Sequence, residues 1–460
     1  MSINLSQNME LIAPAGNLAK LETAFCFGAD AVYCGIPDFS LRTRINEFNL
    51  KALKQGIKFA HETGKNIFIT LNIFSHNRHL SLIEKHVKLL KELKPDGLII
   101  SDPGILSIVK KIWPTVKLHL STQANCTNWQ AAKFWYEQGI SRIILAREVT
   151  LNEIKEIHKR VPKVELECFV HGAMCMSYSG RCLLSKYYND RSANLGDCTQ
   201  PCRWGYEAQS TKHKTQIKHQ IQNSNENYKG VYIREKARPD DLLIIDEDAH
   251  GSYIMNSKDL CLVDYLEKLK RAGITAFKIE GRAKSVYYVG NTVKVYRDAI
   301  DKTNMIKDRE LELKKCQNRG FTTGFLFGKE KCEQKIEASH EKCDWEFCGQ
   351  IVADTVTVGT VGTVGTVGTE QCSVPTVPTS VEHDCLIRVR VHNQIFVGDE
   401  IEFVLPHEKN FKYRVEVIYD KNGKGINEAH GGQGEIVYLP VKKIIPKLTL
   451  LRRRLTKENK

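Results

Sequence analysis

The sequence lacks the features that mark several common classes of protein. It has no run of about 18 apolar residues, the length that a membrane-spanning helix requires. Its first residues, MSINLSQNMELIAPAGN, do not combine a basic region with a long apolar stretch, so a secretory leader is not indicated. Because the apolar content of 42% is ordinary, we expect a cytoplasmic protein without membrane contact.

Several well-known catalytic motifs are also missing. A zinc protease motif H-E-x-x-H is not completed, since His61-Glu62 is followed by Thr63-Gly64-Lys65. The serine-hydrolase elbow G-x-S-x-G is absent, and Ser177-Tyr178-Ser179-Gly180 does not match it. No G-x-G-x-x-G fingerprint follows the first predicted strand, which argues against a dinucleotide-binding open sheet. The chemistry must therefore start elsewhere.

Cysteine, by contrast, is abundant. The chain of 460 residues has 15 cysteines, an odd number that does not suit a small secreted disulfide framework. In a reducing compartment, clustered thiols are more often metal ligands or redox groups. Cys26, Cys34 and Cys126 lie in apolar stretches, and we expect them to be small core residues.

Four cysteines form a cluster with the spacing C-x6-C-x15-C-x3-C, at Cys175, Cys182, Cys198 and Cys202. Structural zinc sites usually combine two pairs of the C-x2–4-C type, and the first gap here is too long for such a pair. Thiolate ligation with irregular spacing favours an iron–sulfur centre. A zinc site, or thiols with a redox or incidental role, remain as alternatives.

The charge balance fits a polyanionic partner. The formal net charge is +13 and the pI is near 8.9, which favours RNA as a partner, although a solvated lysine-rich surface gives the same composition. The terminal sequence KLTLLRRRLTKENK, which follows Pro446, predicts a basic tail at 446–460.

The first two thirds of the chain alternate β-rich runs with amphipathic helical segments. This alternation predicts an α/β fold of the TIM type, a (β/α)8 barrel, rather than a doubly wound sheet. The predicted strands are Glu10–Pro14, Ala31–Gly35, Asn66–Phe74, Gly97–Ser101, Lys117–Thr122, Arg142–Arg147, Val164–Val170 and Ala276–Ile279. Helical spacing marks Leu18–Phe27, Leu50–Thr63, Leu80–Leu93, Trp129–Gln138, Ser285–Lys302 and Lys307–Gln317.

The predicted domain organisation is a barrel followed by a smaller module. The barrel spans 1–320 and carries a cysteine-rich insert at about 171–265, in which 207–240 form an exposed hairpin or flap. A linker at 321–344 leads to a small β-barrel at 345–445, where short alternating strands are separated by Gly and Asn turns. A low-complexity TVG repeat within 355–380 is interpreted as a loop insertion without a function.

Several sequence stretches carry a family resemblance. Residues 167–175, ECFVHGAMC, followed by GRCLLS at 180–185, closely resemble the signature of the collagenase-like peptidase family U32. LIAPAG at 11–16, SLRTR at 40–44 with EFN at 47–49, and KIEGR at 278–282 also resemble family motifs. The resemblance covers nearly the whole chain, except for the TVG insert and 212–234.

The resemblance is strongest to members that take part in the prephenate-dependent hydroxylation of tRNA, which forms 5-hydroxyuridine at the wobble position without molecular oxygen. It implies a 4Fe-4S cluster held by Cys175, Cys182, Cys198 and Cys202, with Cys261 as the alternative fourth ligand. It also implies tRNA as a partner and prephenate as a cosubstrate, and leaves an electron donor or partner protein unknown. A U32-type peptidase and an RNA-binding maturation factor with a structural cluster stay open as alternatives.

Polar residues at the ends of predicted strands are the remaining candidates, because barrel enzymes place working residues there. The catalytic candidates are His171, Glu280 and Arg282, and the substrate-binding candidates are Arg42, Arg44 and Arg147. Forked guanidinium groups suit the two carboxylates of prephenate, but these arginines would equally serve to pair with Glu47 or Glu280. His119, Gln123 and Asn125 are expected on one side of the fifth strand, and Asp102 is expected to cap the helix that starts at Pro103.

Overall fold

The fold is described from a computed structural model of the chain. It covers residues 9–36, 48–175, 177–189, 191, 198–203, 206–209, 231–235, 238–245, 257–328, 340–358, 364–365 and 385–455. Within these residues, no helix combines the length and the apolar character needed to cross a membrane.

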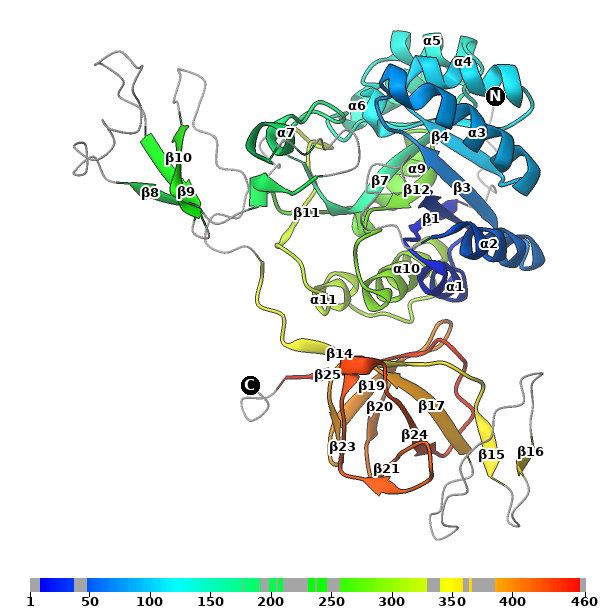
Figure 1. Ribbon diagram of the computed structural model, residues 1–460, viewed down its shortest axis with the longest axis vertical. Helices are drawn as coiled ribbons and strands as arrows, with labels where there is room; N and C mark the ends of the chain where they lie inside the picture. The colour runs from blue at the N-terminus through cyan, green and yellow to red at the C-terminus, as the bar shows by residue number, and fades with distance from the viewer. Residues whose placement is uncertain are drawn as a thin grey trace.

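A closed barrel of eight parallel strands forms the larger part of the molecule (Figure 1). Strand β12 pairs with β1 on one side and with β7 on the other, which closes the sheet and confirms the predicted barrel. All eight predicted strands are present. They are β1 (Glu10–Pro14), β2 (Ala31–Gly35), β3 (Asn66–Leu71), β4 (Gly97–Ile100), β5 (Leu118–Leu120), β6 (Arg142–Ile144), β7 (Glu165–Ala173) and β12 (Ile274–Ile279).

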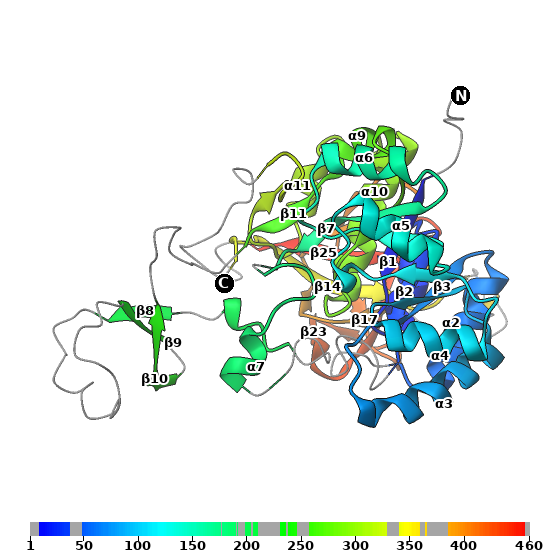
Figure 2. The same ribbon diagram turned by 90° about the horizontal axis from the view of Figure 1, so that it is seen from above.

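Helices connect the strands and cover the outside of the barrel (Figure 2). They are α1 (Leu18–Cys26), α2 (Leu50–Glu62), α3 (Asn77–Leu93), α4 (Pro103–Ile112), α5 (Trp129–Glu137), α6 (Leu151–Arg160), α9 (Leu266–Arg271), α10 (Val286–Asp301) and α11 (Arg309–Lys314). The Asp102 carboxylate accepts hydrogen bonds from the backbone N–H groups of Gly104 and Ile105, so its predicted capping role is confirmed. Cys34 and Cys126 are buried, as expected, whereas Cys26 is half-buried.

The interior of the barrel is filled by side chains. Ile12, Tyr33, Phe68, Ile99 and Ile144 belong to one buried apolar cluster. Below them, at the N-terminal ends of the strands, Arg142 forms ion pairs with Glu10 and Glu165. The ammonium of the buried Lys278, on β12, lies 2.7 Å from Glu167 of β7. The barrel is thus a packed core whose base is closed by charged groups.

The insert between β7 and β12 adds pairings that the sequence pattern did not predict. Strand β11 (Asp259–Cys261) runs antiparallel to β7, and β13 (Phe321–Thr322) pairs with β11 in parallel. Strands β8 (Tyr206–Gln209), β9 (Val231–Glu235) and β10 (Arg238–Ile245) form a separate antiparallel sheet. This sheet projects away from the barrel on the side of helix α7 (Leu184–Asn189), as Figures 1 and 2 show. The expected hairpin is therefore part of a sheet.

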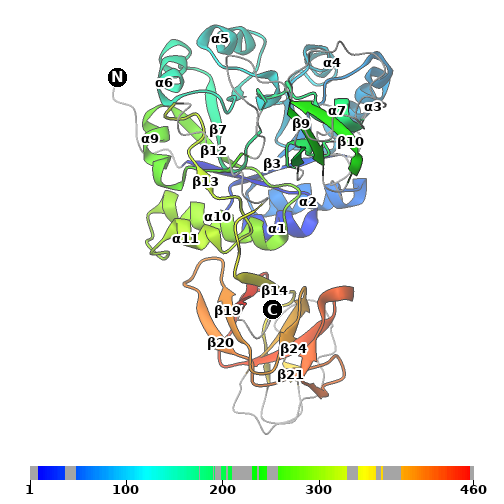
Figure 3. The same ribbon diagram turned by 90° about the vertical axis from the view of Figure 1, so that its left-hand side faces the viewer.

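A curled antiparallel sheet with its own core makes up the C-terminal module, which lies next to α1, α10 and α11 (Figure 3). The strands of the curled sheet are β14 (Trp345–Ile351), β15 (Val356–Val358), β16 (Val364–Gly365), β17 (Cys385–Val391), β19 (Glu400–Val404), β20 (Phe411–Arg414), β21 (Ile418–Tyr419), β22 (Gly425–Ile426), β24 (Ile436–Val441) and β25 (Leu450–Arg454). Strands β18 (Ile395–Phe396) and β23 (Glu428–Ala429) pair with each other in a separate sheet. The start of the TVG repeat is not only loop, because β15 pairs with β17. The exact domain boundaries stay a prediction.

The prediction of a basic tail at 446–460 is wrong for its central residues. Leu450–Arg454 form strand β25, which lies between β14 and β19 in the sheet. The Arg452 side chain is fully buried and bonds to Glu402 of the module and to Glu312 of α11. Arg453 is buried against Glu346 and Asp399. These arginines are structural because carboxylates distant in the sequence neutralise them.

Candidate active site at the barrel mouth

Two of the predicted catalytic residues lie just beyond strand β12, at the C-terminal mouth of the barrel. Glu280 and Arg282 are both buried, and an Arg282 Nη donates a hydrogen bond of 3.1 Å to the Thr70 hydroxyl of β3. The Arg282 guanidinium also lies 5.9 Å from the centre of the Tyr33 ring. The mouth therefore holds a carboxyl group and a guanidinium that are fixed by the barrel wall.

The strand end that carries these residues is tightly packed. Gly281 has a φ of +144°, and a Cβ atom at this position would lie 2.5 Å from the ring of Tyr288. The Tyr288 hydroxyl donates to the Glu280 carbonyl at 2.9 Å. Glycine is required here because any side chain would displace the tyrosine that holds the Glu280 backbone in place.

His171 lies within β7, where it is buried beside the mouth. Its ring is surrounded by Tyr288, Tyr296 and Phe321, with ring centres 5.5 to 5.9 Å apart. Burial, together with the nearby Lys284, lowers the pKa of His171 to about 3, although Glu280 acts in the opposite direction. His171 is thus a neutral imidazole at ordinary pH.

The hydrogen bonds of His171 assign its tautomer. The Tyr296 hydroxyl donates its only proton to the Val170 carbonyl at 2.7 Å. The Nδ1 atom of His171 lies 3.4 Å from that hydroxyl, so Nδ1–H is the donor and Nε2 is left as the acceptor. This arrangement suits a positioning role more than proton transfer at neutral pH.

Arg147 follows β6 on the same face of the barrel. Its guanidinium lies 4.2 Å from the centre of the Phe169 ring, and its backbone N–H donates to the Ser179 hydroxyl at 3.4 Å. Arg147 therefore sits between the mouth and the segment that carries the cysteines. Arg42 and Arg44, the other predicted substrate ligands, lie outside the described residues.

The loop between Cys175 and Cys182 is attached to the mouth at two points. The Glu148 carboxylate accepts hydrogen bonds from the backbone N–H and the hydroxyl of Ser179, at 2.7 and 3.1 Å. Gly180 has a φ of +75°, and a Cβ atom there would lie 2.1 Å from the carbonyl oxygen of Gln123. The cysteine-bearing loop is thus fixed above the ends of β5 and β6, as the barrel prediction requires.

The second part of the cluster is anchored to helix α7. The Ser185 hydroxyl accepts from the backbone N–H of Thr199 at 3.0 Å, and the Asn189 amide donates to the Thr199 hydroxyl. These bonds place Cys198 beside the helix that directly follows Cys182. The short helix at Pro201–Arg203, which contains Cys202, also contacts α7.

The four predicted ligands are accessible thiols. Cys175 and Cys198 are exposed, Cys182 and Cys202 are half-buried, and none of the described cysteines forms a disulfide. Among the described side chains, no three of the types Cys, His, Asp and Glu lie close enough together to hold one metal ion. The donor chemistry of this loop fits an iron–sulfur cluster, while its ligation geometry stays a prediction.

Cys261, the alternative fourth ligand, has a different environment. It lies on β11, where burial raises the pKa of its thiol to about 11, and its Sγ atom is 3.9 Å from the Tyr296 hydroxyl. Because a metal ligand must be a thiolate, this environment disfavours Cys261 relative to Cys202.

The three polar residues predicted along β5 have separate surroundings. His119 is buried inside the barrel against Phe68, and burial holds its pKa well below the ordinary value. Gln123 supports Gly180 through its backbone, and Asn125 has a left-handed φ of +54°. Of the three, Gln123 contacts the cysteine-bearing loop.

Sequence reasoning missed several residues that shape the mouth. Glu148 and Ser179 had no motif to mark their pairing, and neither did Tyr288 and Tyr296. A cavity of about 540 Å³ also lies where the barrel meets the module, lined among others by Lys284, Tyr288 and Trp345. The signal in the sequence that could have pointed to this cavity is Lys284, which comes shortly after the KIEGR stretch.

The arrangement combines a loop of thiols with an enclosed carboxyl group, a guanidinium and a neutral imidazole. Such a mouth can bind a small anion through Arg282 and Arg147, and can bring it next to a redox centre on the loop. Among the described residues, the side chain at hydrogen-bond distance from the His171 ring at the mouth is that of Tyr296, which is not a nucleophile of the serine or cysteine type.

Comparison with known proteins agrees with this picture. The model of peptidase family U32 matches residues 16–336, and that of the peptidase family U32 C-terminal domain matches 376–452. The chain is 38% identical to tRNA hydroxylation protein P of Haemophilus influenzae, over 94% of this chain and 93% of that protein, and 39% identical to the protein of the same name from Escherichia coli, with the same coverage. It is 30% identical to a collagenase of Porphyromonas gingivalis, over 71% of this chain and 75% of that one. On the strength of these matches, the chain belongs to peptidase family U32.

Proposed function

We propose that this protein is an enzyme that hydroxylates tRNA, and that its product is 5-hydroxyuridine at the wobble position. Two relatives named for tRNA hydroxylation align with almost the whole chain. The observation that carries the proposal is the attachment of the cysteine-bearing loop to the barrel through Glu148 and Gln123, at the same end of the barrel as Glu280 and Arg282. A tRNA substrate would also place the protein in the cytoplasm.

The proposed cofactor is a 4Fe-4S cluster held by Cys175, Cys182, Cys198 and Cys202. When bound, it would supply one-electron chemistry at the mouth. The exposure of these thiols and their lack of disulfides support this assignment, and so does the burial of Cys261.

Prephenate is the proposed cosubstrate, in a reaction that does not use molecular oxygen. Arg282 and Arg147 would bind its carboxylates, because a guanidinium can form two parallel hydrogen bonds with a carboxylate. The barrel wall holds both groups in place, which lowers the entropy lost on binding. Glu280 would orient the substrate at the strand end, and the neutral His171 would add no charge to the site.

The first test measures iron and sulfide after strictly anaerobic purification, and then the nucleosides of tRNA from a deletion strain that expresses each variant. We expect about four irons per chain and restored 5-hydroxyuridine for the wild type. Cys175→Ser should lose both, whereas Glu280→Gln should keep the iron and lose the product. Product formation that survives Glu280→Gln and Arg282→Lys would indicate a maturation factor with a structural cluster.

A peptidase is the second candidate, because a relative named as a collagenase aligns with 71% of the chain. It predicts anaerobic cleavage of gelatin that is abolished by Cys175→Ala but is insensitive to iron removal. The hydroxylase proposal predicts no such cleavage.

A further inference from the structure

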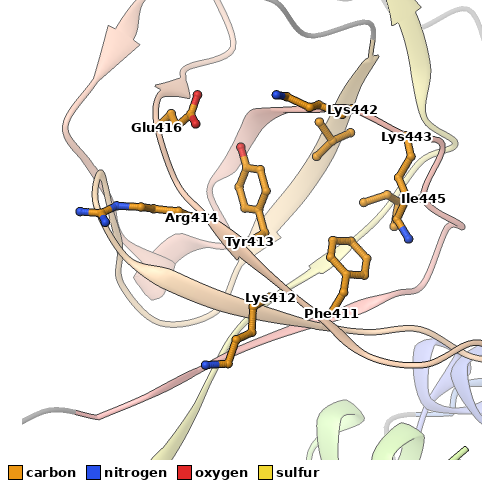
Figure 4. A pocket seen from close by; sticks show the side chains of 9 residues that line it. Phe411, Lys412, Tyr413, Arg414, Glu416, Lys442, Lys443 and Ile445 are labelled. Atoms are coloured by element: carbon orange, nitrogen blue, oxygen red, sulfur yellow. The ribbon is translucent and has the colours of Figure 1, made fainter.

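The C-terminal module has a groove beside strand β20 that has no role so far. It has a volume of about 360 Å³ and lies between β20 and the segment that leaves β24, residues 441–445 (Figure 4). Strand β20 stands at the end of the described sheet, where it pairs with β19 alone. One side of the strand is therefore open next to the groove.

Two aromatic rings in this groove are held in fixed positions. Phe411 and Tyr413 are half-buried, and both pack on the fully buried Phe403, Phe411 in a parallel stack and Tyr413 edge-on. The Tyr413 hydroxyl donates to the Pro440 carbonyl at 2.6 Å. Because the rings are already ordered, a ligand that stacks on them loses little conformational entropy to the protein.

The charge of the groove is positive. Among the described residues, Arg414, Lys442 and Lys443 have no carboxylate within 4.0 Å, while Lys412 is paired with Glu400 at 2.6 Å. Glu416 is the acidic residue of the lining. The Lys443 ammonium lies 3.9 Å from the centre of the Phe411 ring, so cation and aromatic surface are combined at one point.

We propose that this groove, which we call the β20 groove, binds a single-stranded segment of the RNA substrate. Unpaired cations attract phosphates, and ordered rings provide stacking surfaces for bases, which is the combination found in single-strand binding sites. An acidic peptide would use the cations but not the rings. The inference rests on the proposed function, since it assigns a second contact to the same substrate.

The test compares tRNA binding by wild type, a triple variant and a control variant. The triple variant is Arg414→Ala with Lys442→Ala and Lys443→Ala. The control is Lys421→Ala with Lys424→Ala, two exposed lysines of the same module that do not line the groove. Fluorescence anisotropy at several salt concentrations gives the affinity for unmodified tRNA and the slope of log K against log salt, and circular dichroism confirms folding.

We expect the triple variant to reduce the salt slope by about 2, since each lost phosphate contact contributes about 0.7 to 0.9. Phe411→Leu should weaken binding by about tenfold without changing the slope, because it removes stacking and no charge. The control variant should keep both wild-type values.

Three outcomes would overturn the inference. They are unchanged binding by the triple variant, an equal loss in the control variant, and competition by poly-glutamate as strong as that by single-stranded RNA. If the wild type forms 5-hydroxyuridine in cells and the triple variant binds tRNA normally, the proposed role of the β20 groove is refuted, but the proposed tRNA hydroxylation is not. A wild type that neither binds nor modifies tRNA would refute the proposed function itself.

Discussion

The His171 ring is enclosed by three aromatic side chains, and this enclosure determines its charge. A protonated ring would lose its hydration, and this loss outweighs the opposing effect of the Glu280 carboxylate, so the neutral form is favoured. A histidine with an ordinary pKa would change its charge close to neutral pH, whereas this one does not.

The low pKa of His171 makes a prediction about stability. The pKa of His171 is about 3 in the folded chain, and its ordinary value is 6.5. Below pH 6.5 the unfolded chain therefore binds a proton at this residue, whereas the folded chain does not bind it until the pH approaches 3. The free energy of unfolding should therefore decrease as pH falls from 6.5 towards 3, by at most about 1.4 kcal/mol per pH unit from this residue. Urea denaturation of His171→Phe should show a smaller slope with pH, and the exposed His407→Ala controls for the loss of a histidine. An unchanged slope would contradict the assignment.

Gly180 gives a second prediction about a single residue. Gly180→Ala should detach the cysteine-bearing loop, because its Cβ would lie 2.1 Å from a backbone oxygen that cannot move cheaply. We expect loss of most bound iron and of tRNA hydroxylation, with only a small change in overall stability. The control is Gly139→Ala, where φ is also positive, at +84°, but no atom lies within 4 Å of the added Cβ. Equal iron content in the two variants would argue against this anchor.

The loop between Cys175 and Cys182 depends on neighbouring strand ends more than on its own structure. Glu148 follows β6, and its carboxylate accepts two hydrogen bonds from Ser179. These two bonds hold the loop at the end of β6. The spacing of the cysteines predicted the site, but nothing in the local sequence identifies a carboxylate 31 residues away as the partner of Ser179.

Replacement of Glu148 should increase the mobility of the whole loop between Cys175 and Cys182. In Glu148→Ala we expect faster cleavage by trypsin at Arg181 and a lower iron content, while the barrel stays folded. Glu153→Ala is the matched control, because it removes a glutamate from the cap of α6 and costs about 1 kcal/mol of helix stability without touching the loop. Equal protection of Arg181 in both variants would show that Ser179 is held by other contacts.

The elements that could be predicted are those with a local signal. Runs of Ile, Val and Leu marked all eight barrel strands, since parallel strands are buried on both faces. Strand β25 was missed because three consecutive arginines indicate a solvated segment unless their partners are known. The partners, Glu312 and Glu402, lie 140 and 50 residues away. The pairing of β11 with β7 is likewise set by tertiary contacts.

The contact between barrel and module is buried and is both polar and apolar, so we expect the two parts to unfold together. Val404 and Leu450 of the module belong to the core of the barrel, and Phe347 stacks on Tyr287 of α10 with ring centres 5.2 Å apart. Arg452 crosses this contact and bonds to Tyr287 and Asn291 of the barrel.

Replacement of Arg452 should uncouple the two parts. Arg452→Met leaves Glu312 and Glu402 with Lys315 as their remaining cationic partner, and the loss of one side of a buried ion pair costs about 3 to 5 kcal/mol. Calorimetry should show one unfolding transition for the wild type and two for this variant. Arg454→Ala, an exposed neighbour on the same strand, should behave like the wild type. A single transition in Arg452→Met would mean that the apolar contacts alone couple the parts.

The charged base of the barrel has a consequence for the whole molecule. In the part of the chain that the structure describes, Arg142 and its carboxylates lie at one end of the barrel, and the apolar layer above them fills its middle. If the proposed function holds, reactants and products share the entrance at the opposite end, and a bound RNA would then keep a small cosubstrate inside the barrel until the RNA leaves. Such a molecule would load in a fixed order, small reactant first, and steady-state kinetics with RNA in excess would show substrate inhibition.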